Sequence, residues 1–336
     1  MTTSAVLAGL GSYLPPRRVS NEELSERFDT SDAWIHSRTG IRQRRWADVG
    51  VSTGDLAYEA GHRALKSAGL GLGASVDAVI LATTTPDHPC PATAPDVAHR
   101  LKLNSAAAFD VSAVCSGFVY GLTIAASMIE SGHAERVLLI GAETYSTILN
   151  PEDRTTSVIF GDGSGAVLLR SGTPDEPGAL LGFDLGSDGS QKELICIPAG
   201  GSRQRSTHLP PAPQDTYFTM QGKKVFATAV RRMEESSTAL LNRVGWSIDS
   251  VDHLVGHQAN LRILYSLAEQ VRIARDRVVT NIEQVGNTSA ASIPLALAHA
   301  AEQGRFKVGD RLLMTAFGGG LTWGSAVMTW PDVSPS

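Results

Sequence analysis

Apolar residues along the chain form two kinds of segment, and the two kinds alternate. Short apolar runs are typical of buried strands, whereas longer runs rich in Ala, Leu and Met are typical of helices. The predicted strands of the first half are 5–10, 76–83, 106–110 and 136–141, and its main predicted helices are 54–69 and 116–129. This alternation predicts an α/β fold in which helices cover the sheets.

The pattern of the first half returns in the second half. The segment 76–80 has a counterpart at 251–255, and 135–139 has a counterpart at 310–314. The spacing from residue 76 to residue 251 equals the spacing from residue 135 to residue 310, and we call it the repeat offset. A shared offset for two separate matches indicates a duplicated α/β unit.

The duplication predicts where the chain divides. We expect an N-terminal half, residues 1–175, and a C-terminal half, residues 176–336, joined by the Gly- and Pro-containing link 171–177. The segment 186–213 is rich in Ser, Gly, Gln and Pro and has no counterpart in the first half. We expect it to be a surface insertion, and excursions of this length often border active sites.

Cys115 lies where the predicted strand 106–110 turns into the predicted helix 116–129. The free N–H groups of a first helical turn and the positive end of the helix dipole are expected to stabilise a thiolate there. A lone Cys among apolar residues is more often a small core residue. The position at the junction, together with polar residues in the second half, favours a nucleophile.

The repeat offset carries Cys115 to Ala290, which lies in the segment 286–292. This segment predicts a second junction between strand and helix, with Asn287 near its tip. His257 follows the predicted strand 251–255. Symmetric packing of the halves brings these strand ends together. A thiol, an imidazole and an amide suffice for a covalent acyl intermediate, with donors left for developing negative charge.

Composition and charge exclude several function classes. The net charge of −5 and the lack of a long Lys/Arg run argue against nucleic-acid binding. No apolar run reaches the ~18 residues of a membrane span, and the N-terminus lacks the basic segment of a signal peptide. Three cysteines without framework spacing favour a reducing compartment, so we expect a cytoplasmic protein.

Two glycine clusters, 161–165 and 318–320, precede predicted strands. Glycine loops that bind phosphate open helices instead, so neither cluster is interpreted as a nucleotide site. A glycine turn beside a nucleophile offers backbone N–H groups to an oxyanion.

Several motifs together resemble the β-ketoacyl-acyl-carrier-protein synthase III family of the thiolase superfamily. They are DVSAVCSGF at 110–118, GHQANLR at 256–262, GNTSAAS at 286–292, FGGGLTWG at 317–324, Trp34-Ile35 with 38–41, and Asp153-Arg154 before 160–163. The resemblance extends from Leu10 to about Trp330. It implies the thiolase fold, which is a duplicated α/β unit in five layers, αβαβα, and a homodimer.

The resemblance also implies a condensing enzyme that makes a 3-oxoacyl-carrier protein, as in fatty acid or polyketide initiation. Cys115 takes the acyl group from an acyl-CoA, and His257 and Asn287 bind the thioester carbonyl of malonyl-acyl carrier protein as carbon dioxide leaves. The carbanion then attacks the Cys115 thioester, while the N–H groups of Cys115 and Gly319 hold the oxyanion. No cofactor and no metal is implied beyond the acyl-CoA substrate.

Further positions match substrate contacts of the family. Trp34 and Arg154 match the residues that sandwich the CoA adenine, and Arg38 lies near its phosphates. The positions near the pantetheine arm are Asn260 and Gly222, and the position of a carrier-protein contact is Arg262.

Two departures concern the substrates. The family often has an aromatic residue at the end of the acyl pocket, where this chain has Cys90, so we expect a deeper pocket that accepts four-carbon or longer acyl groups. Some members carry lysines on the carrier-protein face, where this chain has Glu269, Gln270 and Ala227. The identities of the acyl chain and of the carrier stay open.

Three other classes of function compete with the condensing enzyme. An acyltransferase of specialised metabolism would load Cys115 in the same way and pass the acyl group to another acceptor without decarboxylation. A cysteine hydrolase also uses Cys, His and Asn, but it leaves Trp34, Arg38 and Arg154 unexplained. A non-catalytic subunit normally lacks the nucleophile.

Overall fold

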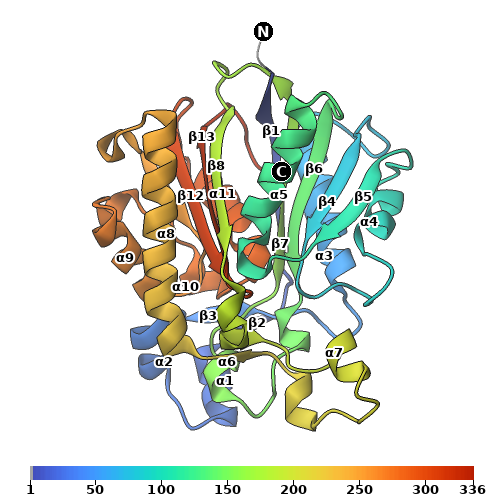
Figure 1. The fold of residues 1–336 in the computed structure, drawn as a ribbon, viewed down its shortest axis with the longest axis vertical. Coiled ribbons are helices and arrows are strands. Elements are labelled where there is room, and N and C mark those ends of the chain that lie inside the picture. Colours follow the sequence, from blue (N-terminus) through green and yellow to red (C-terminus); the bar gives the residue numbers. More distant parts are fainter. Residues whose placement is uncertain (1–2) are drawn as a thin grey trace.

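Residues 3–336 are described by the computed structural model, and two large sheets form their framework (Figure 1). The first sheet consists of β1 (Ser4–Tyr13), β7 (Gly163–Gly172), β6 (Arg136–Glu143), β4 (Ala78–Ala82) and β5 (Ala107–Val111), in that order. The second sheet consists of β11 (His253–Gly256), β12 (Arg311–Gly318), β13 (Thr322–Thr329) and β8 (Leu180–Ser187), in that order. The predicted division between the halves falls in the connection from β7 to β8.

Helices fill the space between the sheets and cover both outer faces. Between the sheets lie α5 (Gly117–Glu130), which contacts β6 and β13, and α11 (Ser292–Glu302), which contacts β7 and β11. The first sheet is covered by α3 (Thr53–Ser67) and α4 (Ala94–Arg100). The second is covered by α8 (Gly222–Val244) and by α9 (Leu261–Gln270), whose Leu264 packs against Gly256 of β11. The expected five layers, αβαβα, are therefore confirmed (Figure 1).

Shorter elements cluster below the sheets in Figure 1. They are β2 (Arg18–Ser20), α1 (Asn21–Arg27), α2 (Asp32–Thr39), β3 (Gln43–Arg45), α6 (Arg154–Ser157) and α7 (Ser202–Arg205). The remaining short elements are β9 (Ile195–Cys196), β10 (Thr219–Met220) and α10 (Ile282–Val285). The segment 186–213, expected as a surface insertion, is mostly exposed. In the described part of the chain, no helix has both the length and the apolar character required to cross a membrane.

Each of the two sheets contains a matching pair of parallel strands. β4 pairs in parallel with β6, with Ala78 opposite Val137, and β11 pairs in parallel with β12, with His253 opposite Leu312. Both members of the second pair follow their counterparts by the repeat offset found in the sequence. The same offset relates two 3₁₀ turns, which we call the elbows: Val114–Ser116 before α5 and Ser289–Ala291 before α11.

Each elbow rests on a strand of the opposite half. The first elbow packs against β12 and the second against β6. Glycine makes the close approach possible, since a Cβ at Gly318 would lie 2.8 Å from the backbone nitrogen of Cys115. A Cβ at Gly141 would lie 2.5 Å from the backbone oxygen of Ala290. Real side chains do not fit at such distances, so these two glycines set how closely the halves approach.

Both elbows begin with an unusual backbone conformation. Val114 has φ +49° and Ser289 has φ +48°, although neither is glycine. Such values are uncommon for residues with a side chain, and especially for a β-branched one such as Val. The packing of each elbow against the opposite half holds this conformation in place.

One strand differs from its prediction. The apolar run 106–110 predicts a buried strand, but β5 is half-exposed along most of its length. It is the last strand of the first sheet, and within residues 3–336 it pairs only with β4, so one of its edges carries no neighbouring strand there.

We predict that Gly141→Ala lowers the free energy of unfolding by ~1–3 kcal/mol, because the added methyl group collides with the second elbow. Gly71 is the matched control, since a Cβ there would meet no atom within 4 Å. Gly71→Ala should leave stability unchanged or raise it by up to ~1 kcal/mol. Urea denaturation measures both values. Equal stability of the two variants would show that the elbow contact is not tight.

Candidate active site

The structure brings Cys115, His257 and Asn287 to one small cavity of about 40 Å³. Cys115 comes from the first elbow, His257 follows β11, and Asn287 precedes the second elbow. The rest of the lining is mainly apolar and consists of Phe160, Ile195, Phe218, Met220, Val225, Ala229, Met233, Ala259, Ile263 and Phe317. An apolar cavity with a few convergent polar groups is the usual form of a small-molecule site.

The Cys115 side chain is buried, with 8% of its surface exposed. Burial, together with the nearby Glu143 carboxylate, raises the pKa of its thiol to about 12. The backbone N–H of Cys115 itself acts in the opposite direction. The sequence predicts a stabilised thiolate from the elbow alone. Desolvation changes the pKa of the Cys115 thiol more than the elbow does, so Cys115 is instead a neutral thiol before substrate binds.

His257 lines the cavity and is almost fully buried. Its backbone N–H donates to the Thr315 oxygen at 2.8 Å, and its Nδ1 lies 2.6 Å from Ser292 Oγ. Burial lowers the pKa of the imidazole to about 3. The ring is therefore neutral at physiological pH and carries one N–H.

Asn287 is fixed through its backbone and its side chain. Its backbone N–H donates to the Ile159 oxygen and its oxygen accepts from Gly161 N–H, both at 2.9 Å. Its side-chain Oδ1 accepts from the backbone N–H of Ser289 at 2.9 Å. With Oδ1 engaged by the second elbow, the Nδ2 amino group is the end that can donate into the cavity.

Backbone donors lie close to the thiol. Gly318 packs against the backbone nitrogen of Cys115, and Gly319 follows it directly in the turn between β12 and β13. Within residues 3–336, neither the Cys115 N–H nor the Gly319 N–H has an acceptor among the turn and loop hydrogen bonds. Two free N–H groups beside a nucleophile match the predicted oxyanion site.

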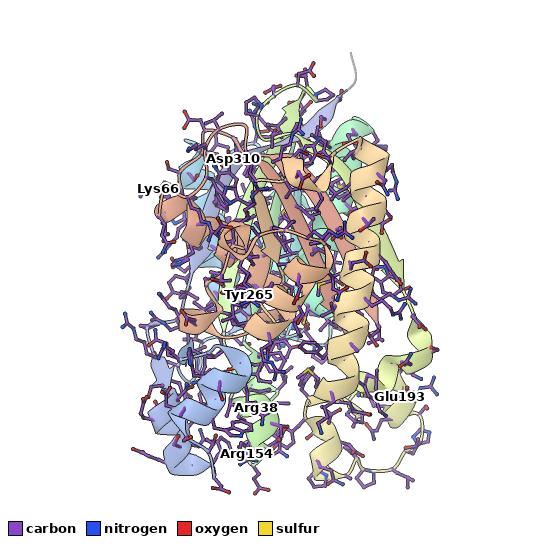
Figure 2. The ribbon with its side chains drawn as sticks, turned by 90° about the vertical axis from the view of Figure 1, so that its left-hand side faces the viewer. Arg38, Lys66, Arg154, Glu193, Tyr265 and Asp310 are labelled. Carbon is purple, nitrogen blue, oxygen red and sulfur yellow. The ribbon has the colours of Figure 1, made fainter. Side chains whose placement is uncertain are left out.

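Trp34, Arg38 and Arg154 form a cluster at the edge of the molecule. The guanidinium carbons of Arg38 and Arg154 lie 6.0 Å and 5.2 Å from the centre of the Trp34 ring. Figure 2 shows Arg38 and Arg154 at the same end of the molecule. Asn260 joins the cluster through a 3.1 Å hydrogen bond from its Nδ2 to the Arg38 oxygen. Trp34 is 40% exposed and is therefore accessible to a planar ligand.

Two further predicted contacts, Gly222 and Arg262, are exposed on the surface. Gly222 begins α8, and Arg262 is exposed on α9 with its guanidinium 6.0 Å from the Phe226 ring. The basic residues Lys223 and Lys224 are exposed beside Gly222. Arg231 and Arg232, further along α8, each pair with Glu235 at 3.0 Å.

The structure does not bring Cys90 to the cavity of its own chain. Cys90 is exposed at the tip of the loop between β4 and α4. Asp87 anchors one side of this loop by accepting the Gly54 N–H at 2.9 Å, and Asp110 accepts the Thr93 N–H on the other side at 2.8 Å. The loop is therefore held in a projecting position, and the predicted contact of Cys90 with an acyl group requires another chain.

The sequence patterns do not single out three polar residues around the site: Glu143, Ser289 and Ser292. Glu143 ends β6 and is fully buried, and burial raises the pKa of its carboxyl to about 7. It accepts hydrogen bonds from the Thr84 N–H and from Thr85 Oγ1, the latter at 2.9 Å. An acidic residue at the end of an apolar strand is a signal for Glu143, but nothing in the sequence marks the two serines.

No group of three or more His, Cys, Asp or Glu is arranged to hold a metal ion in residues 3–336. The polar side chains that line the cavity supply a thiol, an imidazole and an amide.

Comparisons with known proteins agree with this geometry. Two family models match: 3-oxoacyl-[acyl-carrier-protein] synthase III at residues 109–189 and its C-terminal part at 241–330. The chain is 63% identical to β-ketoacyl-[acyl-carrier-protein] synthase III 5 of Streptomyces coelicolor, with 99% of each chain covered. The crystal structure of 3-oxoacyl-(acyl carrier protein) synthase III from Pseudomonas aeruginosa superposes with a TM-score of 0.92 at 52% identity, covering 99% of this chain and 100% of that one.

A solved structure from a polyketide pathway is also similar. The priming β-ketosynthase of the R1128 polyketide pathway has a TM-score of 0.90 and 33% identity, covering 98% of this chain and 97% of that one. The motifs, the five layers and these similarities agree along the whole length. The chain therefore belongs to the 3-oxoacyl-[acyl-carrier-protein] synthase III family.

Proposed function

We propose that this protein condenses an acyl-CoA with malonyl-acyl carrier protein to give a 3-oxoacyl-carrier protein, carbon dioxide and free CoA. The observation that carries the proposal is the meeting of Cys115, His257 and Asn287 in one apolar cavity. The names of the relatives, which are β-ketoacyl synthases III, support the same reaction. No cofactor takes part.

In the first half-reaction, the sulfur of Cys115 attacks the acyl-CoA thioester. The N–H groups of Cys115 and Gly319 stabilise the tetrahedral oxyanion, and the CoA thiolate leaves. The thiol proton of Cys115 goes to the departing CoA, so that no net charge is created in a cavity where burial raises the thiol pKa to about 12. Trp34 and Arg154 hold the adenine.

The phosphates and the pantetheine arm of CoA bind to residues near Trp34 and Arg154. Arg38 contacts the phosphates, while Asn260 and Gly222 lie along the pantetheine arm. The exposed Trp34 ring with its two flanking guanidinium groups suits a stacked base next to anionic phosphates.

In the second half-reaction, malonyl-carrier protein loses carbon dioxide and its thioester becomes an enolate. His257 and Asn287 donate hydrogen bonds to the enolate oxygen. The carbanion attacks the acyl carbon on Cys115, the carbon–sulfur bond breaks, and the Cys115 thiolate takes up a proton from solvent. A neutral imidazole suits this task, because a donor is required and no proton is transferred to substrate.

The proposed assembly is a homodimer in the cytoplasm. The half-exposed edge of β5 has no partner strand in the described chain, and Ile124 and Met128 of α5 are only partly covered. An unpaired edge of this kind is suited to pairing with a second copy. The three free cysteines suit a reducing compartment. Arg262, with Lys223 and Lys224 nearby, forms the basic surface for an acidic carrier protein; no nucleic acid or membrane is involved.

Cys115→Ala should abolish acylation while the protein stays folded, because the thiol is the nucleophile. Incubation with acetyl- or butyryl-CoA followed by intact-mass analysis measures the acyl adduct. Cys196→Ala is the matched control, since Cys196 is a free cysteine outside the cavity, and it should acylate normally. An acyl adduct on Cys115→Ala would mean that another residue is the nucleophile.

Asn287→Ala should acylate at Cys115 but lose ~10²–10³ in the rate of decarboxylation, which is the usual cost of one lost donor. Carbon dioxide release from malonyl-carrier protein measures this step, with exposed Asn242→Ala as control. Normal decarboxylation by Asn287→Ala would remove Asn287 from the mechanism. It would also favour an acyltransferase that works without decarboxylation.

In the proposed dimer, the projecting loop inserts Cys90 into the acyl pocket of the second chain. Cys is smaller than the aromatic residue that the family resemblance leads us to expect at this position, so four-carbon or longer acyl-CoAs should be preferred to acetyl-CoA. Each added methylene contributes about 0.8 kcal/mol until the pocket is full. Cys90→Phe should shift the ratio of kcat/KM values toward acetyl-CoA, and Cys90→Ser should not. An unchanged ratio of kcat/KM values for Cys90→Phe would show that this loop does not determine the preference for acyl-chain length.

A further inference from the structure

A neutral imidazole can present either a donor or a lone pair, and His257 must therefore be held in one tautomer. If the proton is on Nε2, that nitrogen donates and Nδ1 accepts; if it is on Nδ1, the roles are reversed. The proposed enolate chemistry needs a donor facing the cavity. The group that contacts Nδ1 decides which tautomer is present.

Ser292 makes that contact. It is the first residue of α11 and has 1% of its surface exposed, and its Oγ lies 2.6 Å from His257 Nδ1. The backbone N–H of Gln258 points at the same Oγ, at 3.4 Å. Because the Ser292 Oγ already accepts a hydrogen bond from this backbone N–H, its own hydroxyl hydrogen is free to donate to Nδ1 of His257. A lone pair on Nδ1 then leaves the ring proton on Nε2.

The duplication supports the pairing of these two residues. By the repeat offset, His257 corresponds to Ala82 and Ser292 corresponds to Gly117. In the first half, these counterparts also adjoin each other, since a Cβ at Gly117 would lie 3.2 Å from the Ala82 Cβ. The half without the imidazole therefore lacks the hydroxyl at the matching position. The hydroxyl is thus found in the half that carries the imidazole, and it is not a general feature of the repeated fold.

We infer that Ser292 is a positioning residue that holds His257 as the tautomer protonated on Nε2. The inference rests on the proposed function, which needs that N–H at the enolate oxygen. The second elbow and the start of α11 then set the two donors: the Ser289 N–H orients the Asn287 amide, and the Ser292 hydroxyl orients the His257 ring. With the other tautomer, a lone pair of Nε2 would face the enolate oxygen and repel it.

The test combines a spectrum with the two half-reactions. In wild-type protein labelled with ¹⁵N-histidine, the His257 signals should show a protonated Nε2 and an unprotonated Nδ1, with His257→Gln used for assignment. Ser292→Ala should lose this fixed tautomer, acylate Cys115 at close to the wild-type rate, and release carbon dioxide ~10²-fold more slowly. Ser237→Ala is the matched control, since Ser237 is fully buried on α8 and outside the cavity.

Each result bears on one claim. A wild-type signal with the proton on Nδ1 would overturn the inference without any variant having to fold. So would a Ser292→Ala protein that matches Ser237→Ala in both tautomer and decarboxylation. A wild-type protein that does not condense at all would instead contradict the proposed function, while the spectrum would still report the tautomer.

Discussion

The site depends on the packing of each elbow against a strand of the opposite half. Gly318 of β12 lies against the backbone of Cys115, and Gly141 of β6 lies against that of Ala290. These two contacts between the halves place the thiol of one half beside the histidine and asparagine of the other. Neither half contains all three catalytic side chains, so the proposed reaction requires the two halves to pack closely together.

The same packing excludes water from the site, and this desolvation determines the protonation states of Cys115 and His257. Burial raises the pKa of the Cys115 thiol to about 12 and lowers that of His257 to about 3, so both groups rest in their neutral forms. Neutral groups with fixed hydrogen-bond directions suit a reaction in which charge develops on the substrate. Specific neighbours, namely Ser289 and Ser292, then decide which atoms of Asn287 and His257 face the cavity.

The sequence alone predicts much of this arrangement, because the repeat and the apolar runs reflect local periodicity. The repeat offset relates the paired strands and both elbows, and it leads from Cys115, found at a junction of strand and helix, to the segments that hold His257 and Asn287. An apolar run does not reveal whether its strand is central or at an edge, which is why the prediction of a buried strand is wrong for β5. The charge of Cys115 depends on a comparison of burial with the effect of the elbow, and burial is known only from the fold. The contact of Ser292 with His257 and the projecting position of Cys90 are likewise tertiary features.

The most direct test follows one turnover of the wild-type protein. The acyl-enzyme is formed with butyryl-CoA, freed from excess CoA ester, and mixed with malonyl-carrier protein labelled with ¹³C in its free carboxyl group. The account predicts that the acyl mass leaves the protein, that one labelled carbon dioxide is released per acyl group, and that the carrier gains a 3-oxoacyl chain. Transfer of the butyryl group without release of labelled carbon dioxide would contradict it.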